Sequence, residues 1–512
     1  MNLSSPMNKP FIMAFASLFL GMLGSLGMAP YNIWPILLLS LSGFYLILNQ
    51  SKSVRGSFFY GWLFGFGYFF AGLFWVKNAL LVDGNPFSWI WPLAVAGLPS
   101  LLAFFTGVPT AIAKRLAPLD KAHGFLSLTA CMAAGEWLRG FVFTGYPWNL
   151  YGYTWADFLP MVQTVAVGNI YYLTWMTIFW FCLPGFWLLD HKNISKSKKI
   201  LGVFALVSFC ACALFGYWRL QTPVTYRDDV AIRIVQPNIP QSEKWDRKKT
   251  AAHFDKIIEL SRNKDGAPGK VIIVWPETAL GYWTVEDPIS MARITEMLKT
   301  YPDGAVLLTG LLRVEREKPA YYNSMVMIDS DGIISNIYDK SHLVPFGEYI
   351  PFKKWIPLEP VVKFNGFASG DGAKTFEALG IKYSPIICYE VIFPGKIVSQ
   401  EDEFPDVLIN ITNDAWYGFS AGPHQHFTQA VFRAVEEGIP MVRAANTGTS
   451  GIITPLGQVY EKSNLFSDYE KKLAIPSHNV LFKHNVWFKE FAFIILILAT
   501  ISSSYLRERK KY

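Results

Sequence analysis

Residues 383–390 read YSPIICYE, an apolar, β-branched run that ends in a lone cysteine and then a carboxylate. Its length and composition are those of a strand with both faces covered. Two other runs end in a similar way, at 270–278 (KVIIVWPET) and 333–342 (IISNIYDKSH). Each places a cysteine, a glutamate or a lysine just past the C-terminal end of a strand, where α/β sheets bind their ligands.

Around these runs, from about 221 to 487, short β-branched segments alternate with helical patterns. The pattern predicts strands at 230–236, 270–275, 305–309, 323–328, 333–338, 383–388, 406–411 and 440–444. It predicts helices at 248–262, 288–299, 391–400 and 425–437. Ser330-Asp331-Gly332 is typical of a hairpin turn. We expect an α/β domain with a mixed sheet, or two sheets packed together.

The remainder of the chain is far more apolar. Apolar residues make up 52% of the sequence and charged residues 17%, against about 45–50% and 25% in soluble domains. A bilayer-spanning helix needs about 20 mainly apolar residues. Eight runs qualify: about 11–28, 34–48, 58–76, 89–113, 124–144, 159–189, 200–218 and 488–506. We expect a membrane domain at 1–220, an exported domain at 221–487, and an eighth span with a basic tail at 488–512.

The basic residues between these runs predict an orientation. Lysines and arginines concentrate in alternate loops and after the last run. The positive-inside rule places those loops and both termini in the cytoplasm, so the 221–487 domain faces the opposite side, the periplasm of a Gram-negative cell. We therefore predict a multi-pass protein of the bacterial inner membrane. The net charge of +7 arises partly from these loops and does not indicate nucleic-acid binding.

The cysteines differ in their surroundings. Four of the five, Cys131, Cys182, Cys210 and Cys212, fall in predicted spans, where small apolar packing residues are expected. Cys388 stands alone in the exported domain, a setting in which cysteines are usually disulfide-bonded. Counting alone leaves a reactive thiol and a buried structural thiol as equal alternatives.

Acyl transfer by a thiol requires three kinds of group. A thiolate attacks, a carboxylate takes and returns the proton, and an ammonium with backbone N–H groups stabilises the oxyanion. Taken singly, Glu277 or Lys340 at a strand end is usually a solvated charge. Together with Cys388 and the N–H of Tyr389 they supply the whole set.

Several segments carry a family resemblance. WPE (275–277), YDK followed by HLVPFGE (338–348), and CYE (388–390) resemble the nitrilase superfamily, which has a Glu-Lys-Cys triad. QPN (236–238) and NDAWYG (413–418) extend the match. Seven spans, such a domain and one last span resemble the apolipoprotein N-acyltransferase family in particular, over essentially the whole chain.

This resemblance implies an α-β-β-α sandwich on an eight-helix membrane base. It implies that Glu277 is the general base, Lys340 stabilises the tetrahedral intermediate and Cys388 is the nucleophile. It further implies supporting positions at Tyr389, Glu348 and Glu390, and a substrate-loop tryptophan at Trp245. We also expect substrate contacts at Trp416 and Asn413, although a turn cap explains Asn413 nearly as well.

The implied reaction has two half-steps. Cys388 takes an acyl chain from a phospholipid, typically phosphatidylethanolamine, and passes it to the α-amino group of a diacylglyceryl-cysteine at a lipoprotein N-terminus; no cofactor is expected. Lifting about 15 methylenes out of a bilayer costs about 12 kcal/mol, so such an enzyme must bring its site to the lipid. The apolar, irregular segment 341–371 is predicted to be a lipid-touching lid or, alternatively, a packed loop.

Other interpretations remain open. A membrane-tethered amidase would use the same triad, and a transporter or lipid-binding protein would need none of it. His424 and His426 make a poor metal site without a third ligand, and packing at a helix start or a contact in a substrate loop is expected instead. Glu136 and Arg139, inside a predicted span, are either a structural ion pair or part of a headgroup site.

Overall fold

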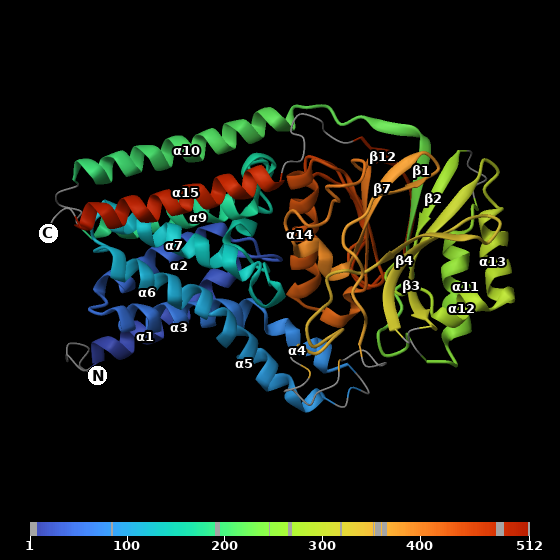
Figure 1. Cartoon of the computed structure of the whole chain (residues 1–512), viewed down its shortest axis with the longest axis horizontal. Helices are drawn as coiled ribbons and strands as arrows, with labels where there is room; N and C mark the ends of the chain where they lie inside the picture. Colours follow the sequence, from blue (N-terminus) through green and yellow to red (C-terminus); the bar gives the residue numbers. More distant parts are fainter. Residues whose placement is uncertain are drawn as a thin grey trace. The chain divides into compact units, whose positions relative to one another are not determined.

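The computed structural model describes residues 8–82, 85, 87–189, 195–244, 246–264, 269–317, 320–351, 353, 360, 366–477 and 486–509. The chain divides into two compact units (Figure 1). One comprises Met1–Lys77, Ile90–Thr222 and His484–Tyr512, and the other comprises Asn78–Trp89 and Pro223–Lys483.

The first unit is helical. Its helices are α1 (Asn8–Gly24), α2 (Trp34–Gln50), α3 (Val54–Gly72), α5 (Trp91–Leu102), α6 (Phe104–Leu116), α7 (Ala122–Arg139), α8 (Leu159–Val162), α9 (Val165–Leu188), α10 (Lys196–Leu220) and α15 (Val486–Arg509), with α4 (Lys77–Leu80) at the border between the units. Among the described residues, five helices are long and apolar enough to cross a membrane, and Val54–Gly72 with Phe74–Leu80, bent by 52°, makes a sixth if the pair is one span. The chain is thus a membrane protein, and the number of eight spans stays a prediction.

Glu136 and Arg139 of α7 form a local ion pair in this unit. Arg139 and Glu136 are almost fully buried, and Arg139 donates to Glu136 Oε2 at 2.5 Å. Arg139 also donates to the carbonyl of Trp148 at 2.9 Å and to that of Tyr146. Because these contacts tie the end of α7 to the turn that follows it, the geometry favours the structural ion pair over a headgroup site.

The second unit contains two six-stranded sheets. The first has the order β12-β1-β2-β3-β4-β5 and the second the order β11-β10-β9-β8-β7-β6. The first consists of β12 (Tyr469–Pro476), β1 (Tyr226–Gln236), β2 (Lys270–Val274), β3 (Ala305–Glu315), β4 (Ala320–Ile328) and β5 (Ile334–Asp339). The second consists of β11 (Val459–Lys462), β10 (Gly451–Ile453), β9 (Met441–Ala445), β8 (Val407–Thr412), β7 (Ile381–Ile387) and β6 (Phe376–Ala378). Each sheet has three neighbouring parallel strands, β1-β2-β3 or β7-β8-β9.

The alternation of side chains along each strand builds two separate cores. In β2, Ile272 and Val274 join the core between the sheets, which also includes Ile387 and Ile409 of the second sheet. Val271 and Ile273 of the same strand face outward, against the helices α11 (Thr250–Ser261) and α13 (Pro288–Leu298). Because both of its faces are covered, β2 is almost wholly apolar.

Helices complete the sandwich (Figure 1). α11 and α13 cover the outer face of the first sheet, with the short α12 (Tyr282–Glu286) beside them. α14 (Ala421–Glu437) packs on the second sheet through β9 and on the 3₁₀ helices η6 (Cys388–Ile392) and η7 (Asp414–Tyr417). The expected α-β-β-α sandwich on a membrane-spanning protein is therefore confirmed.

One predicted element is wrong. The helix expected at 391–400 does not form: η6 ends at Ile392, and no helix follows it before residue 400 among the described residues. Pro394 and Gly395 come directly after, and a proline disfavours helical backbone in the residue before it. The helices at 248–262, 288–299 and 425–437 correspond to α11, α13 and α14. The strands β6, β10, β11 and β12 were not predicted.

Candidate active site

Three strand ends meet at one site. Glu277 follows β2, Lys340 follows β5, and Cys388 follows β7. The first two therefore come from one sheet and the third from the other. All three side chains are buried, with exposed fractions of 6%, 1% and 6% respectively. The site is therefore a buried cluster at which both sheets converge.

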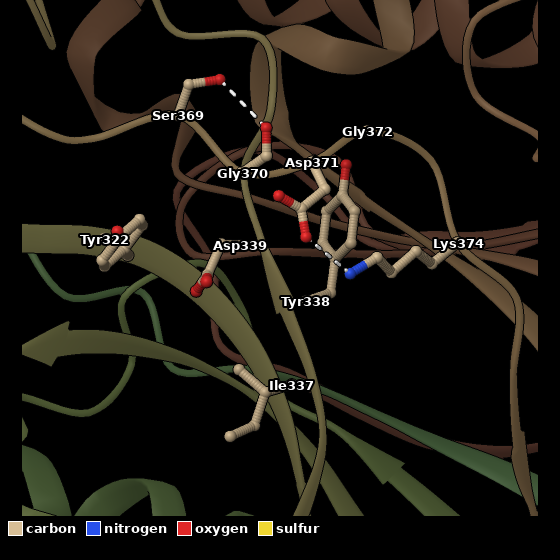
Figure 2. Close-up of a pocket in the computed structure, with 9 residues that line it drawn as sticks. All are labelled: Tyr322, Ile337, Tyr338, Asp339, Ser369, Gly370, Asp371, Gly372 and Lys374. Carbon is tan, nitrogen blue, oxygen red and sulfur yellow. Dashed lines mark hydrogen bonds and ion pairs between the residues drawn. The ribbon is translucent and has the colours of Figure 1, made fainter. Parts of the chain in front are cut away.

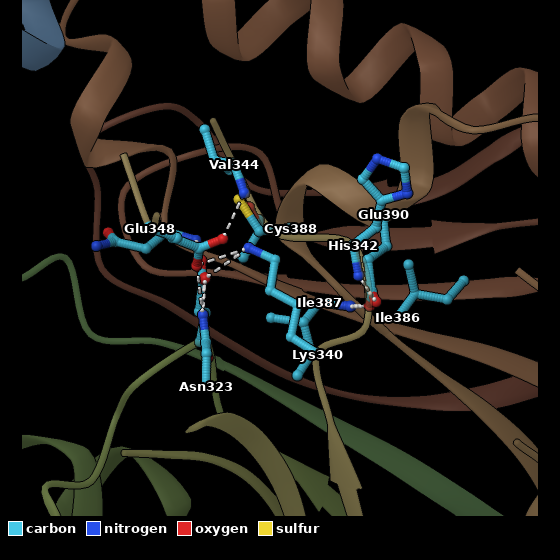
Figure 3. Close-up of polar contacts among 12 residues, drawn as sticks. Asn323, Lys340, His342, Val344, Glu348, Ile386, Ile387, Cys388 and Glu390 are labelled. Carbon is cyan, nitrogen blue, oxygen red and sulfur yellow. Dashed lines mark hydrogen bonds and ion pairs between the residues drawn. The ribbon is translucent and has the colours of Figure 1, made fainter. Parts of the chain in front are cut away.

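Lys340 is the centre of the charged groups. Its Nζ lies 2.9 Å from Glu348 Oε1 and 3.7 Å from Glu277 Oε1. Figure 3 shows the Cys388 side chain beside the Lys340 amine. Burial alone would lower the pKa of Lys340, but Glu348, Glu277 and Cys388 together hold its pKa above the usual value. The ammonium therefore stays charged at any physiological pH.

Asn323 of β4 joins the two carboxylates and escaped the sequence analysis. Its Nδ2 donates to Glu277 Oε1 at 2.7 Å and to Glu348 Oε1 at 3.1 Å. The other oxygen of Glu277 accepts from the backbone N–H of Asn413 at 2.8 Å, and the other oxygen of Glu348 accepts from that of Val344 at 2.8 Å. The only signal for Asn323 in the sequence is an amide side chain at the start of an apolar run, where burial would require hydrogen-bond partners.

The thiol of Cys388 is protonated at rest. Burial raises the pKa of Cys388 to about 12, with a further contribution from the charge of Glu277, while Lys340 acts in the opposite direction. A thiolate is the reactive form, so the proton must leave as the sulfur attacks. A carboxylate within the same charged cluster can accept it.

Glu390 braces the backbone that leads into the nucleophile. Its Oε2 accepts from Ile387 N–H at 2.8 Å. Its Oε1 accepts from Tyr338 OH, from the N–H and hydroxyl of Ser341, and from His342 N–H, over 2.8–3.2 Å. One buried carboxylate thus joins the strand end that precedes Lys340 to the one that precedes Cys388, and fixes the spacing between them.

Lys244 is a second amine at the site that the sequence analysis did not single out. This half-buried side chain donates from Nζ to the carbonyl oxygen of Glu277 at 2.9 Å. Burial lowers the pKa of Lys244 to about 8, and the charges of Glu277 and Cys388 oppose that shift. It lines a cavity of about 50 Å³ together with Pro276 and Thr278.

The remaining predicted residues divide into three groups. Asn413 lies at the site: besides its N–H contact with Glu277, its side chain donates to Gln241 Oε1 at 2.7 Å. Trp416 is half-buried in η7, and Tyr389 is buried in η6, with its ring beside those of His342 and Phe393. Trp245 and residues 352, 354–359 and 361–365 of the expected lid, which include Phe352, Trp355 and Phe364, lie outside the described residues.

His426 lies against the backbone carbonyl of Cys388. His426 Nδ1 is 2.8 Å from Asp414 Oδ1, and its Nε2 is 3.2 Å from the carbonyl oxygen of Cys388. Within the described part of the chain, no group of three or more His, Cys, Asp or Glu side chains is placed to hold a metal ion.

A separate polar cavity lies beside β5 (Figure 2). It has a volume of about 220 Å³. Its lining includes Asp339, whose carboxylate is already paired with Arg313 at 2.6 Å, and Asp371, which is paired with Lys374 at 3.0 Å. None of the three triad residues lines it. Its charges are neutralised, and the reacting groups lie elsewhere.

Comparisons with known proteins agree with this architecture. The profile described as "Apolipoprotein N-acyltransferase N-terminal domain" matches residues 20–183, and that described as "Carbon-nitrogen hydrolase" matches residues 231–473. A Rhodopseudomonas palustris protein named apolipoprotein N-acyltransferase is 37% identical over 473 residues, which are 88% of this chain and 87% of that protein. One of the same name from Brucella suis is 42% identical over 416 residues, 78% and 76% of the two chains. A solved CN-hydrolase superfamily protein from Xanthomonas campestris covers 49% of this chain and is itself covered over 91%, with 18% identity and a TM-score of 0.36.

Proposed function

The chain belongs to the apolipoprotein N-acyltransferase family, and from that premise we propose that Cys388 carries the acyl chain as a thioester between a phospholipid donor and a lipoprotein amine. Family membership makes the protein an acyltransferase of lipoprotein biosynthesis. The single observation that supports the residue assignment is the buried cluster of Glu277, Lys340 and Cys388 at three strand ends.

In the first half-reaction Glu277 removes the thiol proton as Cys388 Sγ attacks the ester carbonyl of the phospholipid. The negative charge that develops on the carbonyl oxygen is stabilised by the Lys340 ammonium and by the N–H of Tyr389. The intermediate collapses with cleavage of the ester C–O bond. Glu277 returns the proton to the leaving oxygen, which departs as the hydroxyl of a lysophospholipid.

In the second half-reaction the α-amino group of a diacylglyceryl-cysteine attacks the thioester. Glu277 accepts a proton from the attacking nitrogen, and the same two donors stabilise the oxyanion. The C–S bond breaks, Cys388 leaves as a thiolate, and the proton on Glu277 restores the thiol. Atoms and charge balance over the cycle, and no metal or cofactor enters it.

The charge balance of the site fits this cycle. Lys340 has two carboxylate partners, of which Glu348 is the nearer at 2.9 Å and Glu277 the farther at 3.7 Å. Glu348 can therefore keep Lys340 in position while Glu277 is protonated during each turnover. We assign Glu348 and Glu390 as residues that position the reacting groups, and Asn413 as one that positions Glu277 through its N–H.

The donor and the setting of the enzyme are further parts of the proposal. Phosphatidylethanolamine is the donor that the family resemblance favours, and Trp245 and Trp416 are proposed to contact the substrates. The distribution of basic loops supports an inner-membrane enzyme with cytoplasmic termini and a periplasmic catalytic domain. The soluble substrate of a tethered amidase would require neither a set of membrane spans nor a site shielded from water.

Transfer to an amine is the test of this function. Purified protein in detergent would receive phosphatidylethanolamine and a synthetic peptide with an N-terminal diacylglyceryl-cysteine, and mass spectrometry would follow the peptide. We expect an added acyl mass on the α-amino group with wild type and none with Cys388→Ala. Free fatty acid without an acylated peptide would show transfer of the chain to water and would contradict the N-acyltransferase function, whereas turnover of small soluble amides alone would support the amidase. Replacing the donor with phosphatidylglycerol tests the headgroup separately.

A further inference from the structure

The backbone of Cys388 is held in an unfavourable conformation. Its φ is +51°, in the left-handed region, which costs a non-glycine residue about 1–2 kcal/mol. Such a conformation persists only when its surroundings impose it. Glu390 holds the chain before the nucleophile through Ile387 N–H. The chain after the nucleophile continues into η6, and a further contact on it comes from a different element, α14.

His426 of α14 provides that constraint. Its Nε2 lies 3.2 Å from the carbonyl oxygen of Cys388, and its side chain is fully buried. Its Nδ1 lies 2.8 Å from Asp414 Oδ1 and 3.0 Å from a guanidinium nitrogen of Arg443. The ring of Tyr417 packs edge-on against the imidazole, with 5.7 Å between the ring centroids. These contacts fix both the position and the orientation of the imidazole ring.

A closed set of buried hydrogen bonds supports this position. Asp414 accepts from Thr412 Oγ1 and from Arg443, both at 2.9 Å. Arg443 also donates to Asn410 Oδ1, and Asn410 Nδ2 donates to the carbonyl of Ile386 at 3.1 Å. The network thus starts at the carbonyl of the nucleophile and returns to the strand two residues before it.

The Cys388 carbonyl and the Asp414 carboxylate are both acceptors, which restricts where the proton on His426 resides. The Nε2 proton is present in the charged ring, and also in the neutral tautomer whose Nδ1 accepts from Arg443. A ring protonated on Nδ1 alone would direct a lone pair at the Cys388 carbonyl. In both protonation states that can donate to the Cys388 carbonyl, the donor is Nε2 of His426.

Peptide planarity extends this contact to the reaction. The Cys388 carbonyl and the Tyr389 N–H belong to one peptide group, and in a trans peptide they point to opposite sides of it. A donor that fixes the carbonyl on the α14 side therefore fixes the N–H on the other side. That N–H is the backbone donor assigned above to the oxyanion.

We propose that His426 is the positioning residue of the oxyanion site: by holding the Cys388 carbonyl, it aims the Tyr389 N–H at the carbonyl oxygen under attack. This inference rests on the proposed role of Cys388 as the nucleophile. Asp414 and Arg443 act through His426, by fixing its ring. The histidine itself touches neither the substrate nor the sulfur.

Two substitutions that retain different halves of the imidazole test this role. The amide nitrogen of His426→Gln falls near the position of Nε2 and keeps a donor for the Cys388 carbonyl. The amide of His426→Asn falls near Nδ1 and keeps only the contact with Asp414. We expect His426→Asn to slow acylation of Cys388 by about 10²-fold, as loss of an aligned oxyanion donor does, and His426→Gln to stay within several-fold of wild type.

The measurement is single-turnover acylation by a labelled phospholipid without acceptor, with the rate followed over phospholipid concentration. The proposal expects the maximal rate to fall in His426→Asn while half-saturation stays unchanged. Equal rates in His426→Asn and wild type, or equal losses in Asn and Gln, would overturn it. No thioester in wild type would overturn the role of Cys388 itself. If His426→Asn does not fold, His426→Met, which fills the site without a donor, replaces it in the comparison with Gln.

Discussion

Each unit of the molecule buries an ion-pair cluster, and the two clusters are built differently. In the helical unit Arg139 meets Glu136 at 2.5 Å, three residues before it in the same helix, and its other terminal nitrogen donates to the carbonyls of Trp148 and Tyr146. In the sandwich unit Lys340 meets two carboxylates, and Glu277 remains 3.7 Å away. In the first cluster the carboxylate is in direct contact with its cation. In the second cluster Glu348 is in direct contact with Lys340, and the more distant Glu277 is the carboxylate that can accept a proton. The difference separates charges that hold structure from charges that react.

Glu277→Gln gives the largest expected effect. Glutamine keeps the size and the hydrogen bond from Asn323 but cannot take a proton, so acyl transfer should fall by about 10³-fold with little change in the melting temperature. The matched control is Glu136→Gln, which should lower the melting temperature and leave the rate per folded molecule unchanged. Activity loss in the control equal to that in Glu277→Gln would erase the distinction between the two clusters.

Lys340→Met separates the catalytic and structural contributions of one residue. Without the ammonium, acyl transfer should fall by about 10²-fold, and the unpaired Glu348 should cost about 3–5 kcal/mol of unfolding free energy. The double variant Lys340→Met, Glu348→Gln should recover stability but not activity. Chemical denaturation and turnover assays on the same samples measure both. Recovery of activity in the double variant would contradict the role of Lys340 in stabilising the oxyanion.

Arg139→Met tests the ion pair of the helical unit by removing its cation. It leaves Glu136 buried without its cation, so we expect a loss of about 3 kcal/mol in unfolding free energy. The remaining folded enzyme should have a normal KM for the phospholipid, because Arg139 is assigned no contact with the donor. A raised KM with unchanged stability would instead support the headgroup site.

Much of the site was predictable from the sequence because its main residues follow apolar strands. Glu277, Lys340 and Cys388 each follow a strand-like apolar or β-branched run within three residues, so their meeting at strand ends follows from the topology. Asn323 and His426 were not predicted as parts of the site. Their partners lie 46 and 38 positions away in the chain, and no local pattern indicates such pairings.

The fold was predictable to a similar extent. Covered strands have strong apolar signals, which is why β2, β3 and β8 were found. The outer strand β6 has only three residues and all four residues of β11 are exposed, so neither shows the alternation that identifies a half-buried strand. The helix predicted at 391–400 failed because a proline and a glycine interrupt an otherwise suitable pattern.

The smallest expected effect concerns Lys244 and pH. The pKa of Lys244 is lowered to about 8 in the folded protein, against about 10.4 in the unfolded chain. Between these values the unfolded state binds more protons, so this residue makes stability rise with pH across that window. Lys244→Met should therefore be more stable than wild type at pH 7, with the gain shrinking between about pH 8 and 10.4. Melting curves over pH measure it, and a gain that is constant with pH would contradict the shift.

Formation of a thioester on Cys388 can be tested directly. Wild type, Cys388→Ala and Cys388→Ser would be incubated with a phospholipid that carries a labelled sn-1 chain, without acceptor, and then treated with neutral hydroxylamine. We expect hydroxylamine-labile label on wild type, none on the alanine variant, and only hydroxylamine-resistant label, if any, on the serine variant. Labile label that persists in Cys388→Ala, or folded wild type that takes up none, would contradict it.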